Sequence, residues 1–333
     1  MRWGRWLVTC AVAALLAAPS AEAGELRISK GFGIHFLPLY VAEHRRLVEK
    51  HAAAAGLGDI KVSWPVIDGG NNINDAMLSG ALDIAAIGVP GFLILWDKAK
   101  GNARFEILGL SAVGAGSLYL NTRNPGIRTL ADFTPRSRIA VPGIKTSYAA
   151  VVLQMAAAQA FGMEHYARLD PLTVGLSHPD AVIAMLSGRS EIDSHVASPP
   201  FSYIELDNPS IHRVFSSVEL FGNMTVIMSC TTRKFRDANP QLTNAVVAAL
   251  DEAAVFVAAN KPEAARIYRE LTKIKSSDEQ IMRILDDPDT RFSIVPQGIM
   301  RYADFMHGVG TLRSKPPSWK DLFAPEISGL PGS

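Results

Sequence analysis

The chain has 333 residues, of which 48% are hydrophobic, and its formal net charge at neutral pH is +1. A chain of this length and hydrophobicity can bury sizeable cores and usually divides into two domains. Its nearly balanced charge excludes recruitment to nucleic acid or to an anionic membrane through bulk electrostatic attraction.

Residues 1–23 have the pattern of an export signal. A start with two arginines is followed by an apolar run over residues 7–18 and by the small-x-small cleavage site Ala21–Glu22–Ala23. We expect a cleaved signal peptide, a mature chain that begins at Gly24 and a periplasmic location. The apolar run is too short to span a bilayer, and no later stretch is expected to be long enough. Cys230 is the only cysteine beyond the signal, so no intramolecular disulfide is expected.

The first part of the mature chain alternates strand and helix patterns. This alternation is typical of a mostly parallel sheet flanked by helices. We predict strands over 25–29, 60–67, 83–87 and 105–113, an amphipathic helix over 37–55, a short helix with Asn72 as its N-cap, and a helix from Pro90.

The pattern begins again after a crossing segment. We predict a strand over 117–121, a helical turn over 129–133, strands over 139–141, 169–174, 191–196 and 212–216, and helices over 147–161 and 179–186. The strand 223–231 is the expected return crossing. Helices over 241–260, 262–271, 277–285 and 297–307 and a tail anchored by Trp319 and Phe323 are assigned to the first part.

The pentapeptide AMLSG occurs twice, at Ala76–Gly80 and at Ala184–Gly188, an offset of 108 residues from 76 to 184. Each copy is followed by an acidic residue, an apolar run and a proline. This offset is the size of a domain and is longer than a solenoid repeat. We therefore predict two similar α/β lobes, the first of residues 24–115 and 225–333 and the second of residues 116–224, with hinges near Ala115 and Met224.

In open parallel sheets a ligand binds beyond the carboxyl ends of the strands, so the loops there are the candidate site. The loop after the first strand carries Phe32, His35 and Phe36, although these rings could also cap the core. Its GFGIHF sequence resembles the start of a dinucleotide fingerprint, but Phe36 stands where the third glycine is needed. His195 ends a buried strand, where it is either a ligand contact or a hydrogen-bonded core histidine.

Two further loops precede helix N-termini, which favour anions. The loop 68–72 offers amides and glycine N–H groups, although ordinary capping would explain the same residues. The loop 143–147 adds the Lys145 ammonium and the hydroxyls of Thr146 and Ser147, a set that suits a sulfonate, a carboxylate or nitrate. The chain has no G-x-S-x-G, C-x-x-C, H-E-x-x-H or P-loop motif, so we predict no enzyme activity, no metal and no cofactor.

Four segments, taken in order and spacing, resemble a known family. PLYVAEHRRLVEK, GGNNINDAMLSGALDIAAIG, IAVPGIKTS and PDAVIAMLSGRSEID followed by SPP are similar to the exported substrate-binding proteins of nitrate, sulfonate and taurine ABC importers. Those proteins share a fold with thiamine-precursor-binding proteins. The resemblance implies a type II periplasmic binding fold that closes on a small molecule and presents it to an inner-membrane permease. It implies ligand contacts at Phe32, His35, Phe36, Asn71, Asn72, Gly88, Pro90, Lys145, Thr146, Ser147, His195, Ser198, Phe221 and Asn223.

The aromatic first loop departs from the small loop associated with nitrate binding. It favours an organic anion with an apolar body, and we expect the protein to act as a monomer. Two alternatives stay open. One is a thiamine-precursor-binding protein or an enzyme of the same fold, against which the export signal argues. The other is a ligand-sensing module that docks on a signalling partner.

Overall fold

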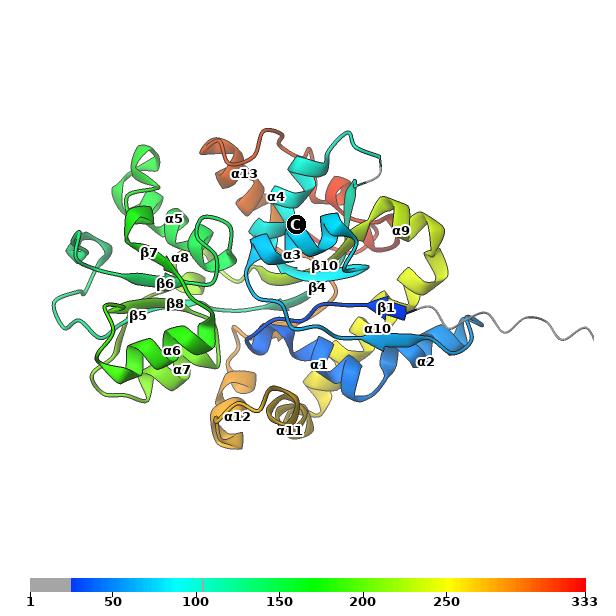
Figure 1. Cartoon of the computed structure of the whole chain (residues 1–333), viewed down its shortest axis with the longest axis horizontal. Coiled ribbons are helices and arrows are strands. Elements are labelled where there is room, and N and C mark those ends of the chain that lie inside the picture. The colour runs from blue at the N-terminus through cyan, green and yellow to red at the C-terminus, as the bar shows by residue number, and fades with distance from the viewer. Residues whose placement is uncertain (1–24, 104) are drawn as a thin grey trace, which may run out of the picture.

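The computed structural model describes residues 25–103 and 105–333. The predicted signal peptide, residues 1–23, lies outside the described residues, so export stays a prediction. Within the described residues the chain forms two lobes, each built around a twisted sheet and covered by helices (Figure 1).

The sheet of the first lobe is made from both ends of the chain. Its four strands lie in the order β11 (Arg291–Phe292), β4 (Ile107–Ala115), β10 (Thr225–Thr232) and β3 (Ile84–Gly88). A bridge between Ile28 and Ile84 extends it to the parallel pair β1 (Glu25–Arg27) and β2 (Lys61–Ser63).

The sheet of the second lobe uses only the middle of the chain. Its five strands lie in the order β7 (Thr173–Gly175), β6 (Ile139–Val141), β8 (Ser194–Ala197), β5 (Tyr119–Thr122) and β9 (His212–Ser216). The α/β, two-lobed fold predicted from the sequence is therefore confirmed. The division of the chain into domains at 115/116 and 224/225 stays a prediction.

Most strands in each sheet point the same way, and the strands that follow a crossing run against them. β5 is antiparallel to β8, and β10 is antiparallel to both β3 and β4. The short β11 also runs against β4. A strand that arrives from the other lobe starts at the cleft, whereas β3 and β8 end there. The opposite direction thus follows from the two crossings.

The helices cover the outer faces of these sheets (Figure 1). Those before the first crossing are α1 (Leu37–His44), α2 (Leu47–Ala54), α3 (Gly70–Ser79) and α4 (Val89–Ala99). Those of the middle segment are α5 (Tyr148–Phe161), α6 (His178–Ser187), α7 (Phe201–Leu206) and α8 (Ser217–Phe221). Those after the return crossing are α9 (Arg233–Ala238), α10 (Pro240–Ala259), α11 (Lys261–Thr272), α12 (Asp278–Asp286) and α13 (Ile299–Gly308).

The two AMLSG copies form the ends of α3 and α6, one in each lobe. Both helices have ten residues, and they start at Gly70 and His178, with the same offset of 108 that separates the pentapeptides. Both end on a glycine in the left-handed conformation, Gly80 at φ 76° and Gly188 at φ 65°, which a residue with a Cβ rarely adopts. Each helix packs on the strand that follows it, β3 or β8. The repeated sequence thus marks a repeated helix-to-strand unit.

Several local predictions are wrong for identifiable reasons. The single helix over 37–55 is two helices, because Arg46 takes a left-handed φ of 52° and interrupts it. The second strand is only three residues long, since Pro65 cannot continue a ladder. The N-cap of α3 is Gly69 and not Asn72, whose Nδ2 donates to the Asp68 carbonyl oxygen at 2.9 Å. The short helices α7, α8 and α9 had no predicted counterpart.

The expectation that no later stretch is long and apolar enough to span a membrane is wrong. With 20 residues, α10 is long and apolar enough for such a span. It packs, however, against α1, α2 and α11, as a core helix does. The tail prediction is confirmed, because Trp319 and Phe323 are buried and Phe323 lies against Gly109 of β4.

Gly114, near the end of β4, lets the site loop lie directly on the strand. A Cβ at this position would be 2.4 Å from the backbone oxygen of His35, well inside contact distance. We expect Gly114→Ala to lower the free energy of unfolding by about 1–3 kcal/mol, because the loop would have to move. Urea unfolding measures this change. The control is Gly329→Ala, where a Cβ would meet nothing within 4 Å; equal stability of the two variants would show that the loop moves freely.

Candidate ligand-binding site

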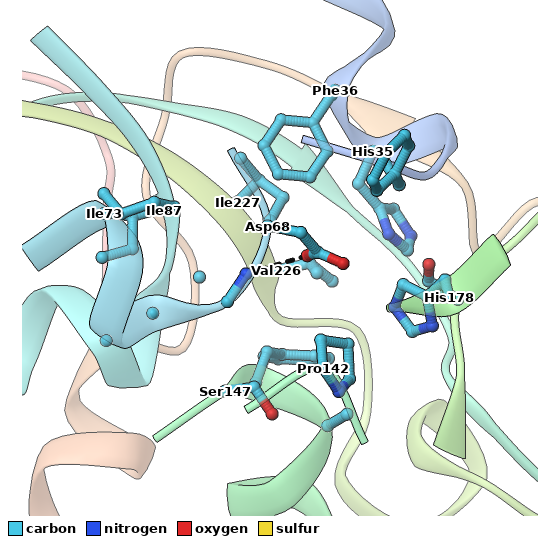
Figure 2. A pocket seen from close by; sticks show the side chains of 18 of the residues that line it. His35, Phe36, Asp68, Ile73, Ile87, Pro142, Ser147, His178, Val226 and Ile227 are labelled. Carbon is cyan, nitrogen blue, oxygen red and sulfur yellow. Dashed lines mark hydrogen bonds between the residues drawn. The ribbon is translucent and has the colours of Figure 1, made fainter. Parts of the chain in front are cut away.

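The candidate site is a cavity of about 70 Å³ between the two lobes. The first lobe contributes the loop before α1, the starts of α3 and α4, and β10. The second lobe contributes the starts of α5 and α6 and the loop after β8 (Figure 2). This volume is well below the roughly 300 Å³ of pockets for drug-sized ligands. As the lobes stand, the cavity therefore suits a small molecule.

Glycines allow the two lobes to meet closely around the cavity. A Cβ on Gly70, at the start of α3, would lie 3.3 Å from the backbone oxygen of Thr146. A Cβ on Gly88, the N-cap of α4, would lie 3.2 Å from the Cβ of Tyr148. The starts of α3, α4 and α5 are thereby brought to one place. Their first-turn N–H groups have no acceptor within their own helices, which is an environment that favours negative charge.

The lobes also hold each other directly at the rim. The Ile34 N–H donates to the Pro199 backbone oxygen at 2.7 Å. On another edge, the Tyr203 hydroxyl donates to Asp287 Oδ2, also at 2.7 Å. These contacts join the middle segment to the first lobe, so the structure shows the lobes closed over the cavity.

Four buried polar atoms of the lining have no hydrogen-bond partner among the described residues. They are His35 Nε2, Asp68 Oδ2, Thr146 Oγ1 and Ser198 Oγ. Buried polar groups are almost always paired, since an unpaired group costs about 1–3 kcal/mol. Four such atoms around one small cavity are groups that a polar ligand could satisfy.

The electrostatics of the lining are unusual for an anion site. Burial raises the pKa of Asp68, although the Gly69 N–H, which donates to Oδ1 at 2.9 Å, and the nearby backbone of His178 partly offset the effect. Burial lowers the pKa of His35 to about 3. Burial, together with the charges of His195 and His35, lowers the pKa of His178 well below its usual value. Both imidazoles are therefore uncharged at neutral pH, and none of the residues that line the cavity is a lysine or an arginine.

The structure brings half of the predicted contacts to the cavity. Seven of them line it: Phe32, His35, Phe36, Gly88, Thr146, Ser147 and Ser198. Ser147 is the N-cap of α5, and its Oγ accepts from the Ala150 N–H at 3.2 Å. Whether each of the seven touches a ligand stays a prediction.

The other predicted contacts lie elsewhere. Asn71 and Asn72 are exposed on the outer side of the first turn of α3, and Pro90 is buried in the first turn of α4. Phe221 ends α8, and Asn223 donates from Nδ2 to the Asp289 backbone oxygen at 2.6 Å, beside a different cavity. None of these five residues lines the site between the lobes.

Lys145 does not supply the expected cation. It has a left-handed φ of 63°, and its side chain is exposed, close enough to Asp170 for its charge to act on that carboxyl group. The loop 143–147 therefore offers the cavity hydroxyls and backbone N–H groups but not an ammonium group.

His195 is a hydrogen-bonded core residue one layer behind the lining. Its Nδ1 lies 2.6 Å from Glu205 Oε1, and its Nε2 lies 2.8 Å from His178 Nδ1. His178, in contrast, lines the cavity (Figure 2). Sequence reasoning missed His178 and Asp68. The internal repeat could have indicated both positions, because residues 68–70 and 176–178 hold matching places where α3 and α6 begin.

The fold is that of the periplasmic binding proteins. The alkanesulfonate-binding protein SsuA from Xanthomonas axonopodis pv. citri, solved with MOPS, is similar over 89% of this chain and 96% of its own, at a TM-score of 0.68 and 20% identity. The periplasmic aliphatic sulphonate-binding protein SsuA from Escherichia coli is similar over 87% of this chain and 89% of its own, at a TM-score of 0.63 and 19% identity. The periplasmic nitrate-binding protein NrtA from Synechocystis PCC 6803 is similar over 88% of this chain and 83% of its own, at a TM-score of 0.67 and 14% identity.

At these identities the similarity shows a shared fold, which matches the fold implied by the sequence resemblance. No family model and no curated protein sequence matches the chain.

Proposed function

We propose that this protein is the periplasmic solute-binding component of an ABC importer. It captures a small organic anion between its lobes and delivers it to an inner-membrane permease. The observation that carries this proposal is the cavity between the lobes, where three helix N-termini meet and four buried polar atoms lack partners within residues 25–103 and 105–333. The protein captures its ligand without transforming it, needs no cofactor and acts as a monomer.

The ligand's anionic group would lie against the start of α5. Thr146 and the first residues of α5 line one part of the cavity, and Ser198 contributes a second hydroxyl from the loop after β8. Phe32 and Phe36 line another part and would pack on the apolar portion. A ligand that touches both lobes stabilises the closed state because the open state offers it fewer contacts.

The test compares Thr146→Val with Lys145→Ala in the binding of methanesulfonate, measured by calorimetry. We expect Thr146→Val to weaken binding about tenfold to 150-fold, since one hydrogen bond to a charged group contributes about 1.5–3 kcal/mol. Lys145→Ala is the matched control, because its side chain lies one residue away but outside the cavity. Equal affinity of all three proteins would remove the α5 start from the site.

A second candidate follows from the hydrogen-bond acceptors of the cavity. Asp68 and the two uncharged histidines suit a ligand that donates hydrogen bonds, such as the aminopyrimidine of a thiamine precursor. A thermal-shift comparison separates the two, because a ligand raises the apparent stability in proportion to its saturation. Stabilisation by an aminopyrimidine and none by methanesulfonate, nitrate or acetate would favour this candidate.

A further inference from the structure

A chain of three buried ionisable side chains leads from the core of the second lobe to the cavity. Glu205 of α7 and His195 of β8 are completely buried, and His178 at the start of α6 is nearly so. Glu205 Oε1 lies 2.6 Å from His195 Nδ1, and His195 Nε2 lies 2.8 Å from His178 Nδ1. Because Nδ1 of His178 is used in this way, Nε2 is the ring nitrogen left for the cavity.

The surroundings hold this chain in place. Asn121 of β5 donates from Nδ2 to Glu205 Oε2 at 2.9 Å. The His178 ring stacks on Phe201, with ring centroids 5.5 Å apart and an angle of 17° between the planes. Both Glu205 oxygens and both His195 nitrogens thus have fixed partners. Of these three side chains, only His178 retains a ring nitrogen without a partner among the described residues.

The hydrogen-bond pattern permits two states that differ by one proton. In the first, His195 is neutral and donates from Nδ1 to the Glu205 carboxylate, so its Nε2 accepts from His178 Nδ1, and His178 Nε2 is an acceptor. In the second, a proton added at His178 Nε2 is accompanied by transfer of the Nδ1 proton of His178 to His195 Nε2. His195 is then an imidazolium beside Glu205, and His178 presents an Nε2–H donor.

An anion in the cavity requires the second state. The first state faces the ligand with a lone pair and leaves the Glu205 charge uncompensated in a completely buried position. The other ionisable groups around His178 are His35, from the loop before α1, and Asp68 and Asp180, at the starts of α3 and α6. None of these supplies a positive charge, since His35 is uncharged, so the compensating charge must come from a proton.

We propose that Glu205, His195 and His178 form a proton relay that sets whether His178 donates or accepts at the cavity, so that the anionic ligand binds together with one proton. His178 is the ligand contact that determines specificity, and His195 and Glu205 are positioning residues. The coupling to an anion depends on the proposed function, whereas the relay itself does not.

Ring-nitrogen NMR of the histidines in the ligand-free full chain tests the relay without a ligand. In the wild type, we expect every molecule in which His195 is an imidazolium to carry the proton of His178 on Nε2 and not on Nδ1. In Glu205→Gln, which keeps the shape but not the charge, both rings should stay in the first state. His212, bonded from Nε2 to the Ile127 oxygen at 2.7 Å, reports that the second lobe remains folded. If His178 has the same tautomer in Glu205→Gln as in the wild type, the relay is refuted.

Calorimetry with methanesulfonate in buffers of different ionisation enthalpy tests the coupling. We expect uptake of about one proton per bound anion in the wild type and in Asp68→Asn, and almost none in Glu205→Gln. Loss of uptake in Asp68→Asn, or none in the wild type, would refute the coupling. Failure of methanesulfonate, nitrate and acetate to bind would refute the proposed ligand class and the coupling with it, while the ring tautomers would still decide the relay.

Discussion

Glu205→Ala is expected to lower the free energy of unfolding by about 3–5 kcal/mol, because it removes one partner of a completely buried, hydrogen-bonded pair. His195 Nδ1 would lose its acceptor, and Asn121 would keep only the Ser202 carbonyl oxygen. The space left by the side chain adds a cavity cost, since the core around α7 and β8 cannot fully collapse. Urea unfolding followed by circular dichroism measures the loss.

Two variants separate this effect from a general loss of charge. Glu205→Gln should cost less than Glu205→Ala, because its Oε1 can still accept from His195. Glu191→Ala removes a carboxylate of the same lobe that is 72% exposed and 3.7 Å from Arg138, so it should cost no more than about 1 kcal/mol. If Glu205→Ala lost as little as Glu191→Ala, water would have to replace the carboxylate, and the buried pair would have no structural role.

Long periodic segments were predictable from the sequence because their signals are local. The predicted strand 139–141 and helix 147–161 match β6 and α5 closely, since the serine at the start, the apolar run and the glycine after the end act within a few residues. The repeat located α3 and α6 for the same reason. The break at Arg46 was not predictable in this way, because no proline or glycine marks it in the sequence. The end of β2, in contrast, had a local signal in Pro65, which the predicted strand 60–67 passed over.

The site was predictable as a set of loops but not as a set of side chains. The order of strands placed the loops that carry Phe36, Thr146 and Ser198 at one cavity. The direction of a side chain within such a loop depends on single backbone angles, and the left-handed φ of Lys145 turned the one expected cation away. The partnership of His178 with His195 and Glu205 joins α6, β8 and α7, so no local pattern could reveal it.

Asp68→Asn should strengthen the binding of methanesulfonate at neutral pH by about tenfold to a hundredfold. Two like charges about 5 Å apart repel by about 3 kcal/mol at an effective dielectric constant of about 20, and the variant removes this repulsion from the cavity. Calorimetry measures the gain. The matched control is Asp75→Asn, which removes the same charge from an exposed position within α3, the helix that follows Asp68, and should change affinity little.

The pH dependence of stability gives the same variant a second readout. Burial raises the pKa of Asp68 in the folded chain, so the folded state holds its proton at pH values where the unfolded state has lost it. The wild type should therefore lose stability as the pH rises from the ordinary aspartate range through the raised folded value, and Asp68→Asn should lose less over that interval. If the variant instead bound methanesulfonate more weakly than the wild type, Asp68 would have to be protonated in the complex and donate to the anion, and the cavity would then take up a proton at α3 as well as at α6.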